Sequence, residues 1–502
     1  MIAFGPYKFD RATGTLWRNG ALVALGGRGA ALLAALLATE GAVVPKDALI
    51  ERAWPGVLVE ENNLAVQIGH LRRTLGQRSD GTLWIETVAR AGYRLAAAPP
   101  ASQDMLPAIA VLPFVAMDDV GSFADGFVED LTTALSRFRT FTVVSRTSAE
   151  TFRVSGMEVR RIAKTLGVRY LIEGSVRRNG RNVRLTAQLL DGETGLHLWS
   201  EKLDGALEDI FDFQDRLVAR VVAVFEPQIR RAEIERARRK RPESLDAYDL
   251  YLRALPLLRG VRDFQLEHFD EAIVLLEQAI ALDPSFAPAL ALCAGAHELR
   301  LSNGGVAPPG VDDAREALDL VERALQADSS DAMVLTQAGS LSLVLAGNEA
   351  RAFALLRQAE ALNPNSVLIA NTVAYCFWHA GQIEESIARR MRILTLMAAS
   401  PEVVWPMNGL AEAHLSAGRI EEALHWGLRV LERTSVFDRV HCVVAAAYVH
   451  LGRQADAEAQ IRRAVAIWPD LTIDRLIGAK KAPKAQFRLL EQGLLRAGLP
   501  QK

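Results

Sequence analysis

The second half of the chain repeats itself at the interval typical of a paired-helix unit. Similar apolar segments end at positions spaced by 45, 35, 37, 34 and 34 residues, namely Pro284, Ser329, Pro364, Pro401, Ser435 and Pro469. Four of these ends follow a glycine by 17 to 20 residues: Gly347, Gly381, Gly418 and Gly452. A unit of this length cannot bury its apolar face alone, so neighbouring copies must stack. The repeat therefore predicts an all-α solenoid over residues 246–490 of the 502-residue chain.

The two clearest copies are "GLAEAHLSAGRIEEALHWGLRVLERTS" and "VVAAAYVHLGRQADAEAQIRRAVAIWPD", and they resemble tetratricopeptide repeats. About six copies fill the region, with an insertion at residues 303–313 and a tail at residues 491–502. Small residues stand where paired helices must approach, at Ala352, Ala359, Ala423, Ala457 and Ala464. The resemblance implies a concave surface that receives an unknown protein or peptide. The alternative is that the array only dimerises or stabilises the chain.

Residues 1–97 change character over short distances, as a small α+β domain does. Three strand-like segments come first, with Asn19-Gly20 as a hairpin turn: Ile2–Phe9, Thr15–Arg18 and Ala21–Leu25. Three helices are expected next, at Gly29–Thr39, Pro45–Trp54 and Asn62–Leu75. The segments Trp84–Val88 and Tyr93–Ala96 then predict a two-stranded wing around an Ala-Arg-Ala-Gly turn.

The third expected helix has one apolar stripe and one polar face. The stripe recurs at helical spacing and predicts burial of Leu64, Ile68, Leu71 and Leu75. The opposite side presents amide, imidazole and guanidinium groups that can reach base edges, from Asn62, Asn63, Gln67, His70 and Arg73, with Arg72 toward the DNA backbone. On the wing, Arg90 is placed to enter a minor groove and Arg94 to meet phosphate. A polar face that binds nothing is the alternative.

Two segments, "NNLAVQIGHLRRTLG" and "WIETVARAGYRL", resemble the recognition helix and wing of the OmpR/PhoB-type winged-helix DNA-binding domain. The resemblance covers the first 97 residues and implies binding to double-stranded promoter DNA. One departure is the Gly26-Gly27-Arg28-Gly29 start of the first helix, where the family usually has a Thr cap and an acidic residue. These glycines do not make a nucleotide-binding loop, because the third glycine and a βαβ context are missing.

Residues 98–106 are expected to be a linker, and residues 107–226 a small α/β domain with a mixed sheet. The expected order is strand Ala108–Val115, helix Phe123–Phe138, strand Phe141–Ser145, helix Glu158–Leu166, strands Arg169–Arg178, Asn182–Leu190 and Leu196–Leu203, and helix Ile210–Phe225. The order and the motifs "IAVLPF", "YLIEGSVRR" and "LWSE" resemble the TolB amino-terminal-like domain. A basic run, Arg230–Arg241, lies in an expected linker helix over residues 227–245 and is interpreted as solvated rather than as a phosphate-binding arm.

The sequence lacks the common signatures of catalysis. It has no P-loop, no H-E-x-x-H, no paired C-x-x-C and no G-x-S-x-G motif. The acidic group at Asp118, Asp119, Asp125 and Glu129 suits helix capping and solvation better than a cyclase-type metal site. The three cysteines, Cys293, Cys376 and Cys442, lie in apolar helical stretches and are expected to be buried thiols. We therefore expect no enzyme, no metal and no cofactor.

Charge and hydropathy narrow the partners further. With 58 Lys and Arg against 60 Asp and Glu, the net charge is −2, so attraction to DNA must come from a local patch. Residues 62–94 provide one, with a net charge of +3. The start of the chain has no signal-length apolar segment, and the run Ala30–Ala38 is too short to cross a bilayer, so a cytoplasmic protein without membrane contact is expected.

These observations predict a multidomain, one-component transcriptional regulator whose organisation resembles regulators of the HilA kind. RNA polymerase and a protein or peptide on the array are the expected partners, with a possible homodimer on DNA. Two alternatives stay open: a protein-interaction scaffold whose winged helix no longer binds DNA, and a cyclase-associated signalling protein. Salt-dependent binding to duplex DNA separates the regulator from the scaffold.

Overall fold

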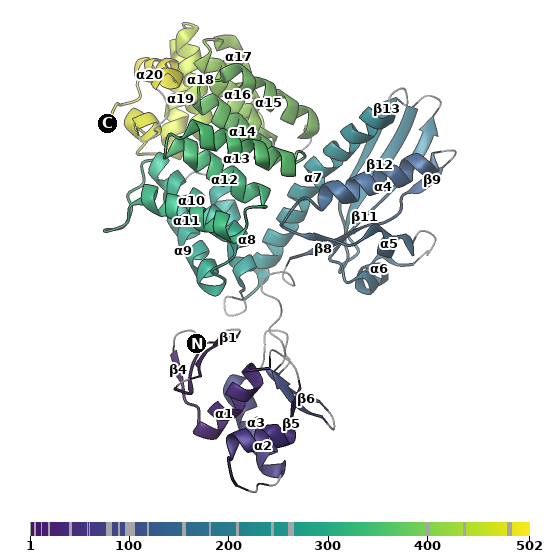
Figure 1. Ribbon diagram of the computed structural model, residues 1–502. Helices are drawn as coiled ribbons and strands as arrows, with labels where there is room; N and C mark the ends of the chain where they lie inside the picture. Colours follow the sequence, from purple (N-terminus) through teal and green to yellow (C-terminus); the bar gives the residue numbers. More distant parts are fainter. Residues whose placement is uncertain are drawn as a thin grey trace. The chain divides into compact units, whose positions relative to one another are not determined.

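The computed structural model of the chain divides into two compact units, Met1–Met105 and Leu106–Lys502 (Figure 1). It describes all residues except 1, 5–6, 12, 19–20, 40–42, 58, 60, 77–82, 89–90, 96–105, 118–119, 153–156, 180–181, 207–209, 242–244, 260–265, 398–400, 435–437 and 479–483. The fold class expected from the sequence is confirmed, with a small sheet domain, a mixed sheet and a helical array.

The first unit opens with a four-stranded antiparallel sheet in the order β1-β2-β3-β4. The strands are β1 (Ile2–Phe4), β2 (Tyr7–Asp10), β3 (Thr15–Arg18) and β4 (Ala21–Val23). The single strand expected over Ile2–Phe9 is thus two strands that pair with each other, Ile2 opposite Phe9. Three helices follow: α1 (Gly27–Leu37), α2 (Lys46–Ala53) and α3 (Glu61–Leu75). The glycine-rich start of α1 has no side-chain cap, since Gly26 occupies the N-cap position.

The wing contains one more strand than the sequence predicts. Strands β6 (Ile85–Val88) and β7 (Gly92–Leu95) pair as expected, but β5 (Val44–Pro45) adds to the other edge of β7. Pro45 therefore precedes α2 as a strand residue and does not begin that helix. The close approach needs Gly92, because a Cβ there would collide with the carbonyl oxygen of Val44 and φ at Gly92 is 148°.

The second unit begins with a mixed sheet in the order β10-β8-β11-β12-β13, with β9 also paired to β11. Its strands are β8 (Ala108–Val111), β9 (Val115–Met117), β10 (Thr142–Val143), β11 (Tyr170–Asn179), β12 (Asn182–Asp191) and β13 (His197–Ala206). The expected strand Ala108–Val115 is split, because Pro113 has no N–H for the ladder and Val115 pairs further along β11, opposite Ser175.

Two layers of helices cover the mixed sheet (Figure 1). Helices α4 (Gly121–Leu135) and α7 (Ile210–Arg239) pack on the face that carries Ile109, Val111 and Ile172. Helices α5 (Arg146–Glu150), which the sequence did not predict, and α6 (Val159–Leu166) belong to the other face, with Ala110 and Leu171. Alternate residues of one strand therefore belong to two separate hydrophobic cores, one on each face of the sheet.

Helix α7 runs 30 residues without a break, through Pro227. The sequence predicts a helix end at Phe225 and a solvated linker helix after it, but the second half of α7 packs against the rest of the unit. Ile229 and Glu233 are both 2% exposed. Glu233 accepts hydrogen bonds from Tyr170 at 2.6 Å and from Arg169. The start of the basic run thus ties α7 to the mixed sheet through Glu233, and to the array through an ion pair of Arg230 with Glu402.

The remaining helices of the described chain form six antiparallel pairs and a final helix. They are α8 (Ala247–Arg259) with α9 (Leu266–Leu282), α10 (Ala287–Ser302) with α11 (Asp313–Ala327), α12 (Ala332–Val344) with α13 (Glu349–Leu362), α14 (Val367–His379) with α15 (Ile383–Met397), α16 (Val404–Ser416) with α17 (Ile420–Leu431), α18 (Asp438–His450) with α19 (Gln454–Ile467), and α20 (Lys484–Arg496). Short helical turns η3 (Pro401–Val403) and η4 (Asp474–Gly478) precede α16 and follow α19. The stacked pairs are the solenoid that the repeat predicts.

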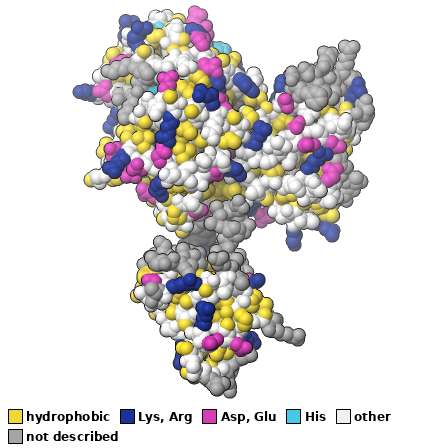
Figure 2. All heavy atoms as spheres, in the orientation of Figure 1, with side chains coloured by type: hydrophobic (Ala, Val, Ile, Leu, Met, Phe, Trp, Pro, Cys, Tyr) yellow, Lys and Arg dark blue, Asp and Glu magenta, His cyan; other side chains and the backbone are white. Residues whose placement is uncertain are grey.

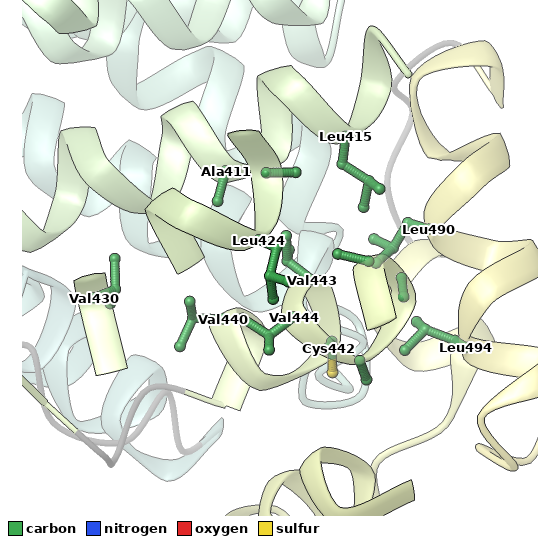
Figure 3. Packing of buried hydrophobic residues seen from close by; sticks show 14 of the residues in the cluster. Ala411, Leu415, Leu424, Val430, Val440, Cys442, Val443, Val444, Leu490 and Leu494 are labelled. Atoms are coloured by element: carbon green, nitrogen blue, oxygen red, sulfur yellow. The ribbon is translucent and has the colours of Figure 1, made fainter. Parts of the chain in front are cut away.

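Small residues let the paired helices approach, as the repeat requires. Ala352, Ala359, Ala423, Ala457 and Ala464 are all fully buried. At the end of the array, Leu424, Val443 and Val444 pack with Leu490 and Leu494 of α20 (Figure 3). The expected tail at residues 491–502 is therefore partly helical, and its Leu494 and Leu499 are buried in this core. The three cysteines are buried, and burial raises the pKa of Cys293 and Cys376 to about 12.

Basic and acidic side chains are mixed over the face of both units drawn in Figure 2. This agrees with the near-zero net charge of the whole chain. None of the helices in the described residues is both long enough and apolar enough to cross a membrane.

Candidate nucleic-acid interface

Helix α3 presents the predicted polar face because its apolar stripe is buried in the core of the first unit. Leu64, Ile68, Leu71 and Leu75 are at most 2% exposed and pack with α1, α2 and the first sheet. The carbonyl oxygen of Leu75 accepts a 2.6 Å hydrogen bond from the buried hydroxyl of Tyr7, which ties the end of α3 to β2. The rotation of α3 about its axis is thereby fixed, and so is the set of side chains that face outward.

The predicted site residues of α3 other than Arg72 lie on one side of that helix, which we call the α3 face. Asn62, Asn63, His70 and Arg73 are exposed and Gln67 is half-buried on the same helix. Arg94 is exposed on β7. The predicted wing residue Arg90 lies outside the described residues.

Arg72 occupies a different position from its neighbours. It is half-buried, and its Nε donates to the carbonyl oxygen of Ile85 at 2.9 Å while Nη2 donates to Oγ1 of Thr87 at 2.8 Å. Its guanidinium carbon also lies 5.9 Å from the centroid of the Tyr93 ring. These contacts make Arg72 the connection between α3 and the wing, so its cationic group serves first to position the two elements.

Two other predicted cations, one on α3 and one on the wing, have weaker local contacts. Arg73 lies 3.2 Å from Nδ1 of His70 through its Nη2, which joins two side chains one turn apart. Arg94 forms an exposed ion pair with Glu86 across the wing, at 2.6 Å. Exposed pairs of this kind contribute about 0–1 kcal/mol, so phosphate can displace Glu86 at little cost.

Val66 is a surface residue that the sequence reasoning did not include. It is 52% exposed on α3, next to Asn63 and His70 and opposite the buried stripe. An apolar side chain on a DNA-reading face can contact the methyl group of thymine. The signal was available in the sequence, since Val66 lies three residues after Asn63 and four before His70 and is outside the stripe.

Comparisons with known families agree with this geometry. Residues 20–95 match the family model described as "Transcriptional regulatory protein, C terminal", and residues 104–220 match "HilA/YgeH-like transcriptional regulator, second domain". The first match contains α1, α2, α3 and the wing. The second contains the mixed sheet, for which the sequence suggested a TolB-type domain.

Individual relatives cover parts of the chain. The transcriptional regulator HilA of Salmonella typhimurium is 26% identical over 386 residues, which are 74% of this chain and 66% of HilA. A protein of Rhizobium meliloti named putative adenylate cyclase 3 is 35% identical over 249 residues, which are 48% of this chain and 41% of that protein. Among solved structures, the DNA-binding domain of Escherichia coli CadC is 27% identical and covers 19% of this chain and 90% of that domain, with a TM-score of 0.18.

The matched families, the order of the units and the helix pairs give one assignment. The chain joins a winged-helix domain of the OmpR/PhoB type found in transcriptional regulators to a HilA-like second domain and a C-terminal array of tetratricopeptide-like helix pairs.

Proposed function

We propose that this protein is a sequence-specific DNA-binding transcriptional regulator of the one-component type, which inserts α3 into the major groove of promoter DNA. The observation that carries the proposal is the α3 face: exposed amide, imidazole and guanidinium groups lie opposite a fully buried apolar stripe. A surface helix that only contacts solvent needs no fixed orientation relative to the wing. A recognition helix must be held in a fixed orientation so that it fits the major groove. The tie through Arg72 supports that role.

The side chains of the α3 face suit particular parts of the DNA. Asn63 and Gln67 lie one turn apart, and their amides can pair with N6 and N7 of adenine. Val66 beside Asn63 suits a thymine methyl group. Asn62, His70 and Arg73 extend the polar surface along the helix.

The wing and the end of α3 would contact the DNA backbone. Arg94 is proposed to exchange Glu86 for a phosphate, and Arg90 to enter a minor groove. Arg72 would reach phosphate with the part of its guanidinium group that the wing leaves open. These contacts fix the position of the protein on the duplex but carry no sequence information.

The rest of the chain is proposed to control this binding. The helical array would receive a protein or peptide and transmit its presence, and two copies of the chain would pair on tandem half-sites. RNA polymerase and promoter DNA, in the cytoplasm, complete the proposed set of partners. The regulator type of both matched domains supports a role without catalysis.

The test is selection of bound sequences from a random duplex pool by the full chain, followed by mobility-shift titration at two salt concentrations. A selected site should bind more tightly than pool DNA, and affinity should fall as salt rises. Leu22→Ala is a suitable control variant, because Leu22 is 71% exposed on β4 and outside the α3 face. A folded chain that enriches no sequence and binds no duplex would favour the scaffold interpretation.

The cyclase-named relative motivates a second assay. Its 35% identity covers 48% of this chain, so adenylate cyclase activity should be measured directly on the purified protein. We expect none. Measurable turnover, abolished by no variant of the α3 face, would replace the non-catalytic proposal.

A further inference from the structure

A cavity of about 340 Å³ lies on the inner side of the helical array. Seven helices of the array contribute to its wall, namely α8, α10, α12, α14, α15, α16 and α18, and Arg230 of α7 closes one side. Arg230 bonds Glu402 of η3 at 3.0 Å, so the mixed-sheet domain and the array both form the enclosure. A volume of this order suits a small organic molecule rather than a long peptide.

The charged group that points to a ligand is Arg390 of α15. It lines the cavity, is 3% exposed, and has no acceptor for its Nε among the described residues. Ser386 accepts from Nη1, and no carboxylate forms an ion pair with Arg390 in the described part of the chain, although the charge of Glu412 in the cavity wall favours the cation from a longer distance. Burial lowers the pKa of Arg390 to about 10, which still leaves it a cation at neutral pH.

Arg300, another buried arginine of the same array, differs from Arg390 in having carboxylate partners. Arg300 is also 3% exposed, but it bonds Asp313 at 2.6 Å and Asp270 at 2.6 Å. A buried charge that lacks such partners destabilises the folded state, so its retention calls for a partner from outside. Gly409 on α16 makes the space for the Arg390 guanidinium, because a Cβ at that position would collide with it.

The cavity also contains acceptors that lack donors. The Oδ1 atoms of Asn371 and Asn408 are buried and have no hydrogen-bond partner among the described residues. The Asn408 side chain donates to Glu412 at 3.2 Å, so an acidic group lies beside these acceptors. Part of the surrounding wall is apolar and aromatic, with Tyr375, Trp405 and Leu299, while Glu298 and Arg439 add further charged groups. The site therefore offers a cation for an acid, acceptors for N–H or O–H groups, and apolar surface for a side chain.

We propose that this cavity binds a small amino or hydroxy acid, whose carboxylate pairs with Arg390 and whose amino or hydroxyl group donates to Asn371 and Asn408. The ligand would sit against the Arg230–Glu402 contact and so report its presence to both parts of the second unit. This site is additional to the proposed DNA-binding function and does not depend on it.

The experiment is thermal unfolding of the full chain with millimolar concentrations of the proteinogenic amino acids and their 2-hydroxy analogues, each beside its carboxamide. At least one acid should raise Tm by about 2 °C or more while its carboxamide does not, and calorimetry should give one site per chain. Arg390→Met should abolish the shift without lowering Tm in the absence of ligand, since an unpaired buried charge is removed. Arg392→Met is the matched control, because Arg392 is exposed on the same helix and does not line this cavity.

Arg390→Lys is the second variant if Arg390→Met does not fold, and it should reduce affinity at least about tenfold because the planar fork is lost. The proposal is overturned if no acid shifts Tm, if carboxamides act equally, or if Arg390→Met binds as tightly as the unchanged protein. Binding of tripeptides with free carboxyl ends, without binding of any free acid, would also overturn it. None of these readouts involves DNA, so failure here is distinct from failure of the proposed regulator function.

Discussion

Arg72 of α3 donates a 2.9 Å hydrogen bond from Nε to the carbonyl oxygen of Ile85, the first residue of the wing strand β6. Thirteen residues separate the two along the chain. The bond, with its neighbour to Thr87, couples the angle of the reading helix to the wing. An arginine that the sequence assigns to the DNA backbone thus also has an architectural role.

The first prediction follows from this coupling. Arg72→Met should lower the free energy of unfolding of the first unit by about 1–2 kcal/mol, because it removes two hydrogen bonds at once. Urea denaturation followed by tryptophan fluorescence measures it. Arg73→Met, which removes an exposed contact with His70, should change stability by less than about 0.5 kcal/mol. Equal destabilisation by the two substitutions would show that Arg72 has no positioning role.

The second prediction separates base reading from phosphate binding. Gln67→Ala and His70→Ala should each relax preference for a selected site by about 1–3 kcal/mol, since a base contact is lost. Arg94→Ala should weaken binding to all DNA sequences about equally. It should also reduce the slope of log affinity against log salt concentration by about one. Competition mobility shifts with specific and unrelated duplexes measure both effects. If Arg94→Ala alters preference and the α3 variants do not, the assigned roles are reversed.

The third prediction concerns the contact between α7 and the array. Burial opposes the charge of Arg230, but Glu226 and Glu402 raise its pKa above the ordinary value. Glu402→Gln should destabilise the second unit by about 2–4 kcal/mol, because it leaves a largely buried guanidinium with one partner. Glu193→Gln, which weakens the pair of Arg236 with a 71% exposed carboxylate, should cost under about 1 kcal/mol. Chemical denaturation compares them, and equal costs would mean that the α7 contact is not energetically important.

The fourth prediction tests packing between repeats. Ala457→Leu should destabilise the array by about 1–3 kcal/mol through overpacking, since Ala457 is fully buried between paired helices. Ala455→Leu on the same helix is the matched control, because Ala455 is exposed. The Ala457 variant should also lose regulation in a reporter strain while the first unit still binds DNA. A reporter that keeps its response despite a destabilised array would argue against a signal-receiving role.

The fifth prediction is a dependence on pH. Burial, followed by the nearby Asp249, raises the pKa of Asp246 from 3.8 to about 6. An acid that binds its proton more tightly in the folded state stabilises it at low pH, so this contribution is lost as pH rises from about 4 to about 6. The free energy of unfolding of the Asp246→Asn variant should therefore fall by about 1–2 kcal/mol less than that of the unchanged protein over that pH range.

Denaturation of the full chain at several pH values measures this slope. Asp319→Asn is the control, because the Asp319 side chain is 67% exposed and its ion pair with Arg315 is long, at 3.8 Å. An unchanged slope in Asp246→Asn would mean that Asp246 titrates as in the unfolded chain.

Much of the fold follows from periodicity in the sequence. The interval of about 34 residues predicts the helix pairs, and the spacing of Leu64, Ile68, Leu71 and Leu75 predicts the buried side of α3. Both patterns are local, since a residue's place on its own helix decides whether it is buried. For the same reason the outward direction of Asn63 and His70 follows from helical spacing alone, although their contacts with DNA remain predictions.

Two features that the sequence did not predict depend on partners distant along the chain. Nothing in Val44–Pro45 marks a strand until β7 lies beside it. The sequence predicts a helix end at Phe225, yet α7 continues through Pro227 because Phe225 and Ile229 are buried on either side of it.

Local spacing in the sequence is thus sufficient to define most of the elements and the faces that they bury, because those choices depend on near neighbours along the chain. Three side-chain relationships depend instead on how distant elements pack. Arg72 binds the wing, Arg230 binds Glu402, and Arg390 forms no ion pair with a carboxylate within the described residues. Each is decided by tertiary packing, because the partners available to a side chain are the groups that folding brings beside it.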